Sequence, residues 1–113
     1  MSDQAAQRTT AFAERNRILL AMDVDAAKSF IVEHGGTVPK RPLNWERVLH
    51  LARFEVATIP DELRADSRIY LARNGAQSLL TLPHGSPYVR AALDLIFPKR
   101  LTDAHIRKIE SER

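Results

Sequence analysis

The chain has 113 residues, which suits a single domain, and its 44% hydrophobic and 27% charged residues are typical of a globular protein rather than a disordered one. It has no cysteine, which excludes disulfides, thiolate metal sites and cysteine catalysis, and its formal net charge of +3 is a small basic excess. Charges are scattered through the N-terminal part and no apolar run approaches the length of a membrane span, so we expect a cytoplasmic protein without membrane association.

The first part of the chain predicts two helices followed by an extended connector. Apolar residues recur at helical spacing from about residue 4 to residue 22, and Asp23 is a suitable N-cap for a second helix. Gly35 and Gly36 should end that helix, because glycine reaches the left-handed C-cap conformation without a steric cost. The prolines of VPKRPL then keep the chain out of the helical region.

The segment ILLAMDVDAAKSFIVEHGGTV, residues 18–38, resembles the helix-helix half of an ankyrin repeat. The likeness lies in its Asp-Val-Asp-Ala-Ala-Lys start and its Glu-His-Gly-Gly end. The Thr-Pro-Leu-His turn that opens such a repeat is absent, and no period of about 33 residues follows. The resemblance therefore implies a short helical hairpin closed by glycine, and no ankyrin function.

Further helices are predicted after the connector. Asn44 caps a helix over residues 45–57, and Pro60 fits the first turn of the next one, which continues with a kink at residues 66–67 to an Asn-Gly stop at residues 74–75. Each of these helices begins with a residue whose side chain or ring suits a helix start. The local signals therefore favour a series of short helices.

The last third of the chain contains the most apolar helix. Ser86 begins it as N-cap, and its apolar residues cover more than half of the circumference, which predicts a place at the centre of the core. Arg90 and Asp94 form a charged i, i+4 pair on its other side. A short extended segment is predicted near residues 78–82, and Thr102 caps a last short helix.

Together these elements predict an all-α fold, a compact single-domain bundle of five to six short helices over residues 1–113. No linker is long enough to divide the chain, and no low-complexity tract interrupts it. The amphipathic last helix leaves a homo-oligomer open, since an isolated helix of that length is marginal in water.

The tripeptide Pro-Lys-Arg occurs twice, in VPKRPLN at residues 38–44 and in FPKRLTD at residues 97–103. Basic residues just before a helix N-terminus suit a phosphate, so the candidate phosphate contacts are Lys40, Arg41, Lys99 and Arg100. However, Glu46 and Asp103 already place a carboxylate in each following first turn and would repel a phosphate. We call the two Pro-Lys-Arg stretches corners. Each is explained as a helix boundary, and the two matter for binding only if the fold brings them together on one exposed face.

A candidate protein-interaction surface lies on the helix predicted over residues 45–57. Arg47, His50 and Phe54 lie off its apolar stripe, and Trp45 stands at its start. Aromatic residues and arginine are common anchors of binding surfaces, although packing of Phe54 inside the fold is the alternative. We therefore predict a small non-enzymatic helical module that binds another protein. The alternative is a weakly basic nucleic-acid-binding protein that contacts phosphates through its Lys/Arg corners.

No motif predicts catalysis, a metal or a cofactor. Glu46 and His50 have the spacing of two adjacent ligands, but a metal site needs two more and the sequence nominates none. His84, Ser86 and Asp94 supply the residue types of a nucleophilic triad, yet the N-cap role already explains Ser86. Walker, G-x-G-x-x-G and G-x-S-x-G motifs are absent. We expect no enzyme and no cofactor.

Overall fold

The computed structural model is all-α, as predicted, and describes residues 2–75, 82 and 85–98, with only the backbone of residues 2–10. Its five helices in this part of the chain are α1 (Ser2–Ala21), α2 (Val24–Glu33), α3 (Trp45–Glu55), α4 (Asp61–Arg73) and α5 (Pro87–Ile96). No strand occurs in these residues. The last helix predicted from Thr102 lies outside the described residues, as does all but Leu82 of the predicted extended segment.

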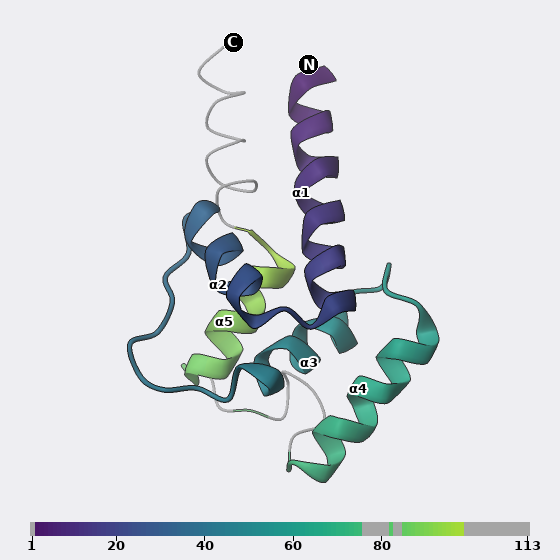
Figure 1. The fold of residues 1–113 in the computed structure, drawn as a ribbon, viewed down its shortest axis with the longest axis vertical. Coiled ribbons are helices and arrows are strands. Elements are labelled where there is room, and N and C mark those ends of the chain that lie inside the picture. The colour runs from purple at the N-terminus through teal and green to yellow at the C-terminus, as the bar shows by residue number, and fades with distance from the viewer. Residues whose placement is uncertain (1, 76–81, 83–84, 99–113) are drawn as a thin grey trace.

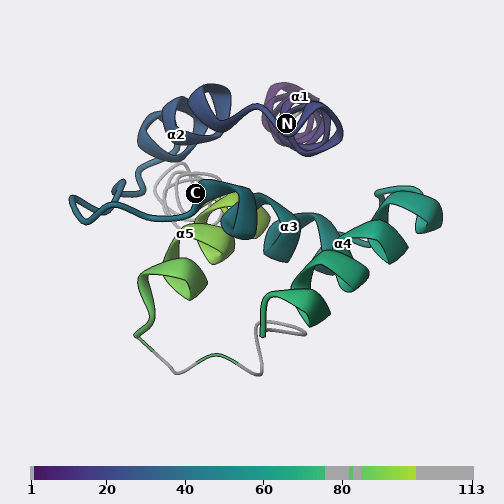
Figure 2. The ribbon, with the colours of Figure 1, turned by 60° about the horizontal axis from the view of Figure 1, so that its bottom comes forward.

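The helices form two layers, with α1 and α2 packed over α3, α4 and α5 (Figures 1 and 2). Helix α3 contacts each of the other four, whereas α5 packs against α2 and α3. The helix predicted to be most central, α5, is well buried, but α3 is the hub of the fold. Residues 48–53 of α3 are all buried, including two polar side chains, because α4 covers the side of α3 that the sequence pattern suggests is solvent-facing.

Three helix starts follow the predicted capping chemistry. The side chain of Asp23 accepts a hydrogen bond from the backbone N–H of Ala26 at 3.1 Å, and Ser86 accepts one from Tyr88 at 3.2 Å. Asn44 accepts from the N–H of Arg47 at 3.4 Å. Each cap satisfies one of the backbone donors that a helix N-terminus leaves without a partner, so these three boundaries are determined locally.

The two glycines after α2 have different roles. Gly35 has a φ of +86°, the left-handed conformation predicted for the end of this helix. At Gly36 the constraint is space, since a Cβ there would lie 2.7 Å from Ile31 Cγ2 and 2.8 Å from Asp94 Oδ2. Gly36 therefore allows the end of α2 to approach α5 closely.

The core is mostly aliphatic, and a buried arginine joins α1 to α5. Leu19, Phe30 and Leu49 are almost fully buried within it. Arg15 of α1 donates a hydrogen bond from Nη1 to the carbonyl oxygen of Ile96 at 2.8 Å, and burial lowers the pKa of Arg15. A cation at this position stabilises the last turn of α5, where backbone carbonyls lack helical partners.

None of the described helices combines the length and apolarity needed to cross a bilayer.

Candidate functional site

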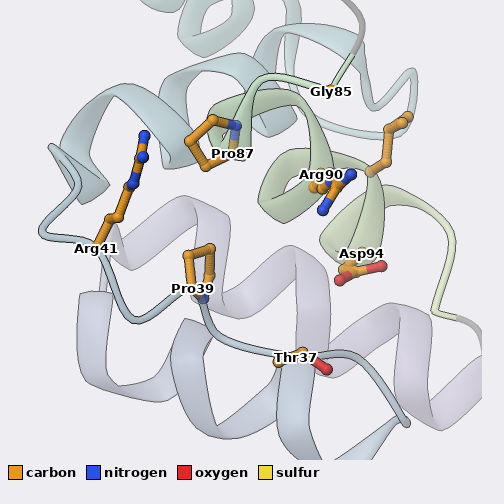
Figure 3. A pocket seen from close by; sticks show the side chains of 8 residues that line it. Thr37, Pro39, Arg41, Gly85, Pro87, Arg90 and Asp94 are labelled. Atoms are coloured by element: carbon orange, nitrogen blue, oxygen red, sulfur yellow. The ribbon is translucent and has the colours of Figure 1, made fainter.

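A cavity of about 620 Å³ lies between α5 and the segment that joins α2 to α3. We call this segment, residues 35–43, the connector, and the cavity the connector–α5 cavity (Figure 3). Its walls combine basic, acidic and apolar side chains. The lining residues are Thr37, Pro39, Arg41, Gly85, Pro87, Arg90, Leu93 and Asp94.

Local sequence explains why both walls have these shapes. Pro39 and its neighbouring proline keep the connector extended, so that it passes across the side of α5 instead of continuing α2. On the opposite wall, Gly85 has a φ of +86° and turns the chain into α5, where Ser86 is the N-cap and Pro87 the first helical residue. Two proline-containing segments thus frame the cavity.

The charged side chains are distributed unevenly around the cavity. Figure 3 shows Arg41 on one side and Arg90 with Asp94 on the other, with the rings of Pro39 and Pro87 between them. Arg41 and Arg90 are exposed, and neither forms an ion pair with any residue in the described part of the chain. Arg90 and Asp94, the charged residues at i, i+4 spacing, lie on the same side of the cavity. Within the described ranges, neither guanidinium group has a carboxylate partner.

The structure locates only one of the two Pro-Lys-Arg corners. Lys40 and Arg41 are exposed on the connector, whereas Lys99 and Arg100 lie outside the described residues. Whether the two corners meet therefore stays a prediction. Within the described residues, Arg41 shares a cavity with Arg90, a residue far from it in sequence.

The predicted interaction surface on α3 is divided between buried and exposed side chains. Trp45 and His50 are each only 8% exposed, while Arg47 and Phe54 are partly exposed. Arg47 donates to the carbonyl oxygen of Asn74 and its guanidinium lies 5.4 Å from the centre of the Tyr88 ring, so that it joins α3 to α4 and α5. Two of the four residues thus belong to the interior.

His50 belongs to a buried polar cluster between α3 and α4. Its Nδ1 lies 3.0 Å from the hydroxyl oxygen of Ser67, which also accepts a hydrogen bond from Arg53 Nε at 2.7 Å. The His50 ring stacks on Tyr70 with a centroid separation of 3.9 Å. Burial and then the nearby Arg53 charge lower the pKa of His50 to about 4, so the ring is neutral at pH 7.

The hydrogen bonds of this cluster stay within the fold. A neutral ring that accepts the Ser67 proton at Nδ1 carries its own proton at Nε2, and this arrangement uses the hydroxyl donor and one acceptor position of the serine. Ser67 is completely buried and cannot reach a substrate. Nε2 lies 3.9 Å from Glu46, at the edge of a smaller cavity of about 320 Å³. In the described part of the chain, no three His, Asp or Glu side chains are grouped to hold a metal.

The other predicted constellation, His84, Ser86 and Asp94, is described only in part. Ser86 is engaged as the N-cap of α5, and His84 lies outside the described residues. Sequence reasoning did not nominate Thr37, and it named Arg90 and Asp94 without connecting them to Arg41, because nothing in the spacing of the two segments indicates that the connector crosses α5. No protein-family model, curated protein or solved structure matches the chain.

Proposed function

We propose that this protein is a non-enzymatic helical interaction module whose protein partner docks over the connector–α5 cavity. The observation that carries the proposal is the presence of two exposed arginines without ion-pair partners in the described residues, Arg41 and Arg90, around a concave site with an apolar centre. Arginine combines a planar hydrogen-bonding fork with an aliphatic stem, and it is frequent among the residues that dominate binding energy. The exposed side chain of Leu93, 39% accessible, adds apolar surface to the rim.

The cavity is a better candidate than the surface predicted on α3. Trp45 and His50 contribute little to any external contact because their rings are buried. Concave sites with a few converging polar groups are the usual form of binding pockets. The connector supplies such a site without disturbing the core.

Site-specific photo-crosslinking tests the proposal. A photoreactive amino acid replaces Leu93 at the cavity or, as control, Ile69, an exposed aliphatic residue of α4 that is 47% accessible. In cells that carry the gene, position 93 should trap a defined protein, identified by mass spectrometry, and Arg41→Ala should reduce the trapping. Equal trapping from both positions, or trapping unaffected by Arg41→Ala, refutes the proposed site.

Nucleic-acid binding is the second candidate. It is supported by Lys40 and Arg41, which are exposed side by side on the connector and form no ion pair with the described residues. Phosphate contacts of this kind weaken steeply with salt. Gel mobility shifts at about 50 mM and about 200 mM salt test it, because two or more phosphate contacts should give a complex that disappears at the higher concentration. Absence of a shift at the lower concentration eliminates this candidate.

A further inference from the structure

We infer that the connector–α5 cavity binds an extended acidic segment of the partner, in which one aspartate or glutamate side chain pairs with Arg41. The inference rests on the proposed function and names the chemistry of the partner at the same site. It is carried by the asymmetry of the cavity, which has a lone arginine on one side and an arginine next to a carboxylate on the other (Figure 3).

The lone arginine indicates an anion. Arg41 is exposed, lies at a bend of the connector, and has no carboxylate partner within the described residues. The fork of a guanidinium group matches a carboxylate with two parallel hydrogen bonds, which adds directional selectivity to the attraction. Partial coverage by a docked segment strengthens such a pair, because the effective dielectric constant falls when water is displaced.

Asp94 favours a carboxylate over a phosphate. It lines the same cavity as Arg41 and Arg90, so the three charged side chains among the described lining residues sum to a formal charge of +1. One aspartate or glutamate side chain matches this charge, whereas a phosphate monoester, with about −1.5 to −2 charges at pH 7, exceeds it. The carboxylate of Asp94 lies close to the end of α2, since a Cβ built on Gly36 would be 2.8 Å from Asp94 Oδ2.

The same residue limits where the acid can lie. An acidic side chain placed beside Arg90 would approach Asp94 as well, whereas one beside Arg41 lies on the other side of the cavity (Figure 3). The Arg90–Asp94 side instead suits a neutral polar group that both donates and accepts hydrogen bonds. Acidic residues are therefore expected at one end of the bound segment only.

The middle of the cavity suits an apolar side chain. The rings of Pro39 and Pro87 lie between the charged sides, and neither residue has a backbone N–H to donate. Leu93 extends this apolar surface at the rim. The expected partner segment therefore carries an acidic residue, then an apolar residue, then a neutral polar residue along an extended backbone.

Selection from a phage-displayed library of random peptides of about twelve residues tests the inference on the full chain. Enriched peptides should contain an aspartate or glutamate next to an apolar residue. The best peptide is then synthesised with blocked ends in three forms that carry glutamate, glutamine or phosphoserine at the acidic position. Affinities are measured by fluorescence anisotropy, and the Nε–H resonances of Arg41 and Arg90 are followed by NMR.

We expect glutamine at the acidic position to weaken binding about tenfold, a change equivalent to about 1.4 kcal/mol. Arg41→Ala should give a similar loss for the glutamate peptide and no further loss for the glutamine peptide, which is the signature of a direct pair. Arg73→Ala, at an exposed arginine of α4, is the matched control and should leave affinity unchanged. Arg41→Glu should restore binding to a peptide with lysine at the acidic position, and far-UV circular dichroism verifies that each variant is folded.

Three results overturn the inference: enriched peptides without an acid, equal affinity of the glutamate and glutamine forms, or tighter binding of the phosphoserine form. Failure of the proposed function gives a different pattern. In that case photo-crosslinking from position 93 traps no protein, or traps nucleic acid, whatever the isolated cavity does with peptides. The two proposals can therefore fail independently.

Discussion

Replacing Ser67 with alanine tests whether the buried polar cluster holds α4 against α3. The hydroxyl of Ser67 is fully buried and joins Arg53 Nε at 2.7 Å to His50 Nδ1 at 3.0 Å. Alanine removes both hydrogen bonds while leaving the two nitrogens in place. Each buried polar group left without a partner costs about 1–3 kcal/mol, and the better helix propensity of alanine returns at most about 0.5 kcal/mol.

We therefore expect Ser67→Ala to lower the free energy of unfolding by about 3 kcal/mol, a large part of the about 5–15 kcal/mol typical of a small domain. Urea unfolding followed by far-UV circular dichroism measures the change, and an unchanged m-value shows that unfolding exposes the same surface. Ser29→Ala on α2 is the matched control, because Ser29 is exposed and belongs to the opposite layer.

A double-mutant cycle separates hydrogen bonding from packing. In an Arg53→Met background one of the two nitrogens is already absent, so Ser67→Ala should cost about 1 kcal/mol less than in the wild type. If Ser67→Ala is no more destabilising than Ser29→Ala, or if its cost is the same in both backgrounds, the cluster does not stabilise the α3–α4 contact in the way described. The cavity between the connector and α5 does not include Ser67, so peptide affinity should be unchanged.

Three further changes have outcomes that follow from the structure. The pKa of His50 is lowered to about 4 by burial and by Arg53, so as pH falls from about 6.5 to about 4 the unfolded chain protonates first. Over this range the wild type should lose about 2–3 kcal/mol of unfolding free energy relative to His50→Gln. The same difference in unfolding free energy between the two proteins at both pH values, measured in urea, would contradict this. Gly36→Ala places a Cβ 2.7 and 2.8 Å from two side chains. It should lower the unfolding free energy by about 1–3 kcal/mol, measured in urea, and weaken peptide binding. If both quantities keep their wild-type values, the neighbouring side chains move aside without cost. Arg15→Met removes the hydrogen bond to the Ile96 carbonyl and the charge at the end of α5, so the unfolding free energy should fall by about 1–2 kcal/mol. A decrease below about 0.5 kcal/mol in urea unfolding would mean that water replaces the arginine without loss of stability.

The helix boundaries were predictable because their causes are local. Asp23, Asn44 and Ser86 bond to backbone groups two or three residues away, so the sequence around each cap contains the whole interaction. Gly35 ends α2 through its own backbone conformation. The same holds for the extended connector, where proline determines its own φ and restricts the residue before it.

Burial of the polar residues on α3 depended on which helix packs against it. Helical periodicity places His50 off the main apolar stripe, which suggests solvent, but α4 covers this side and supplies Ser67 as a hydrogen-bond partner. Periodicity reports the polarity of a face and does not identify the neighbour that covers it. Helical periodicity therefore does not predict the burial of a polar residue when its partner lies on another helix.

The sequence alone determined that this is an all-α protein, where its described helices begin, and that Arg41 lies in a proline-containing connector between two helices. Only the tertiary structure decided that Arg41 shares a cavity with Arg90 and Asp94, and that Gly36 provides the space for this approach. The physical reason is the distance along the sequence over which the interactions act. Caps and turns involve a few neighbouring residues, whereas the cavity is formed by two segments that lie close together because of the packing of the whole core.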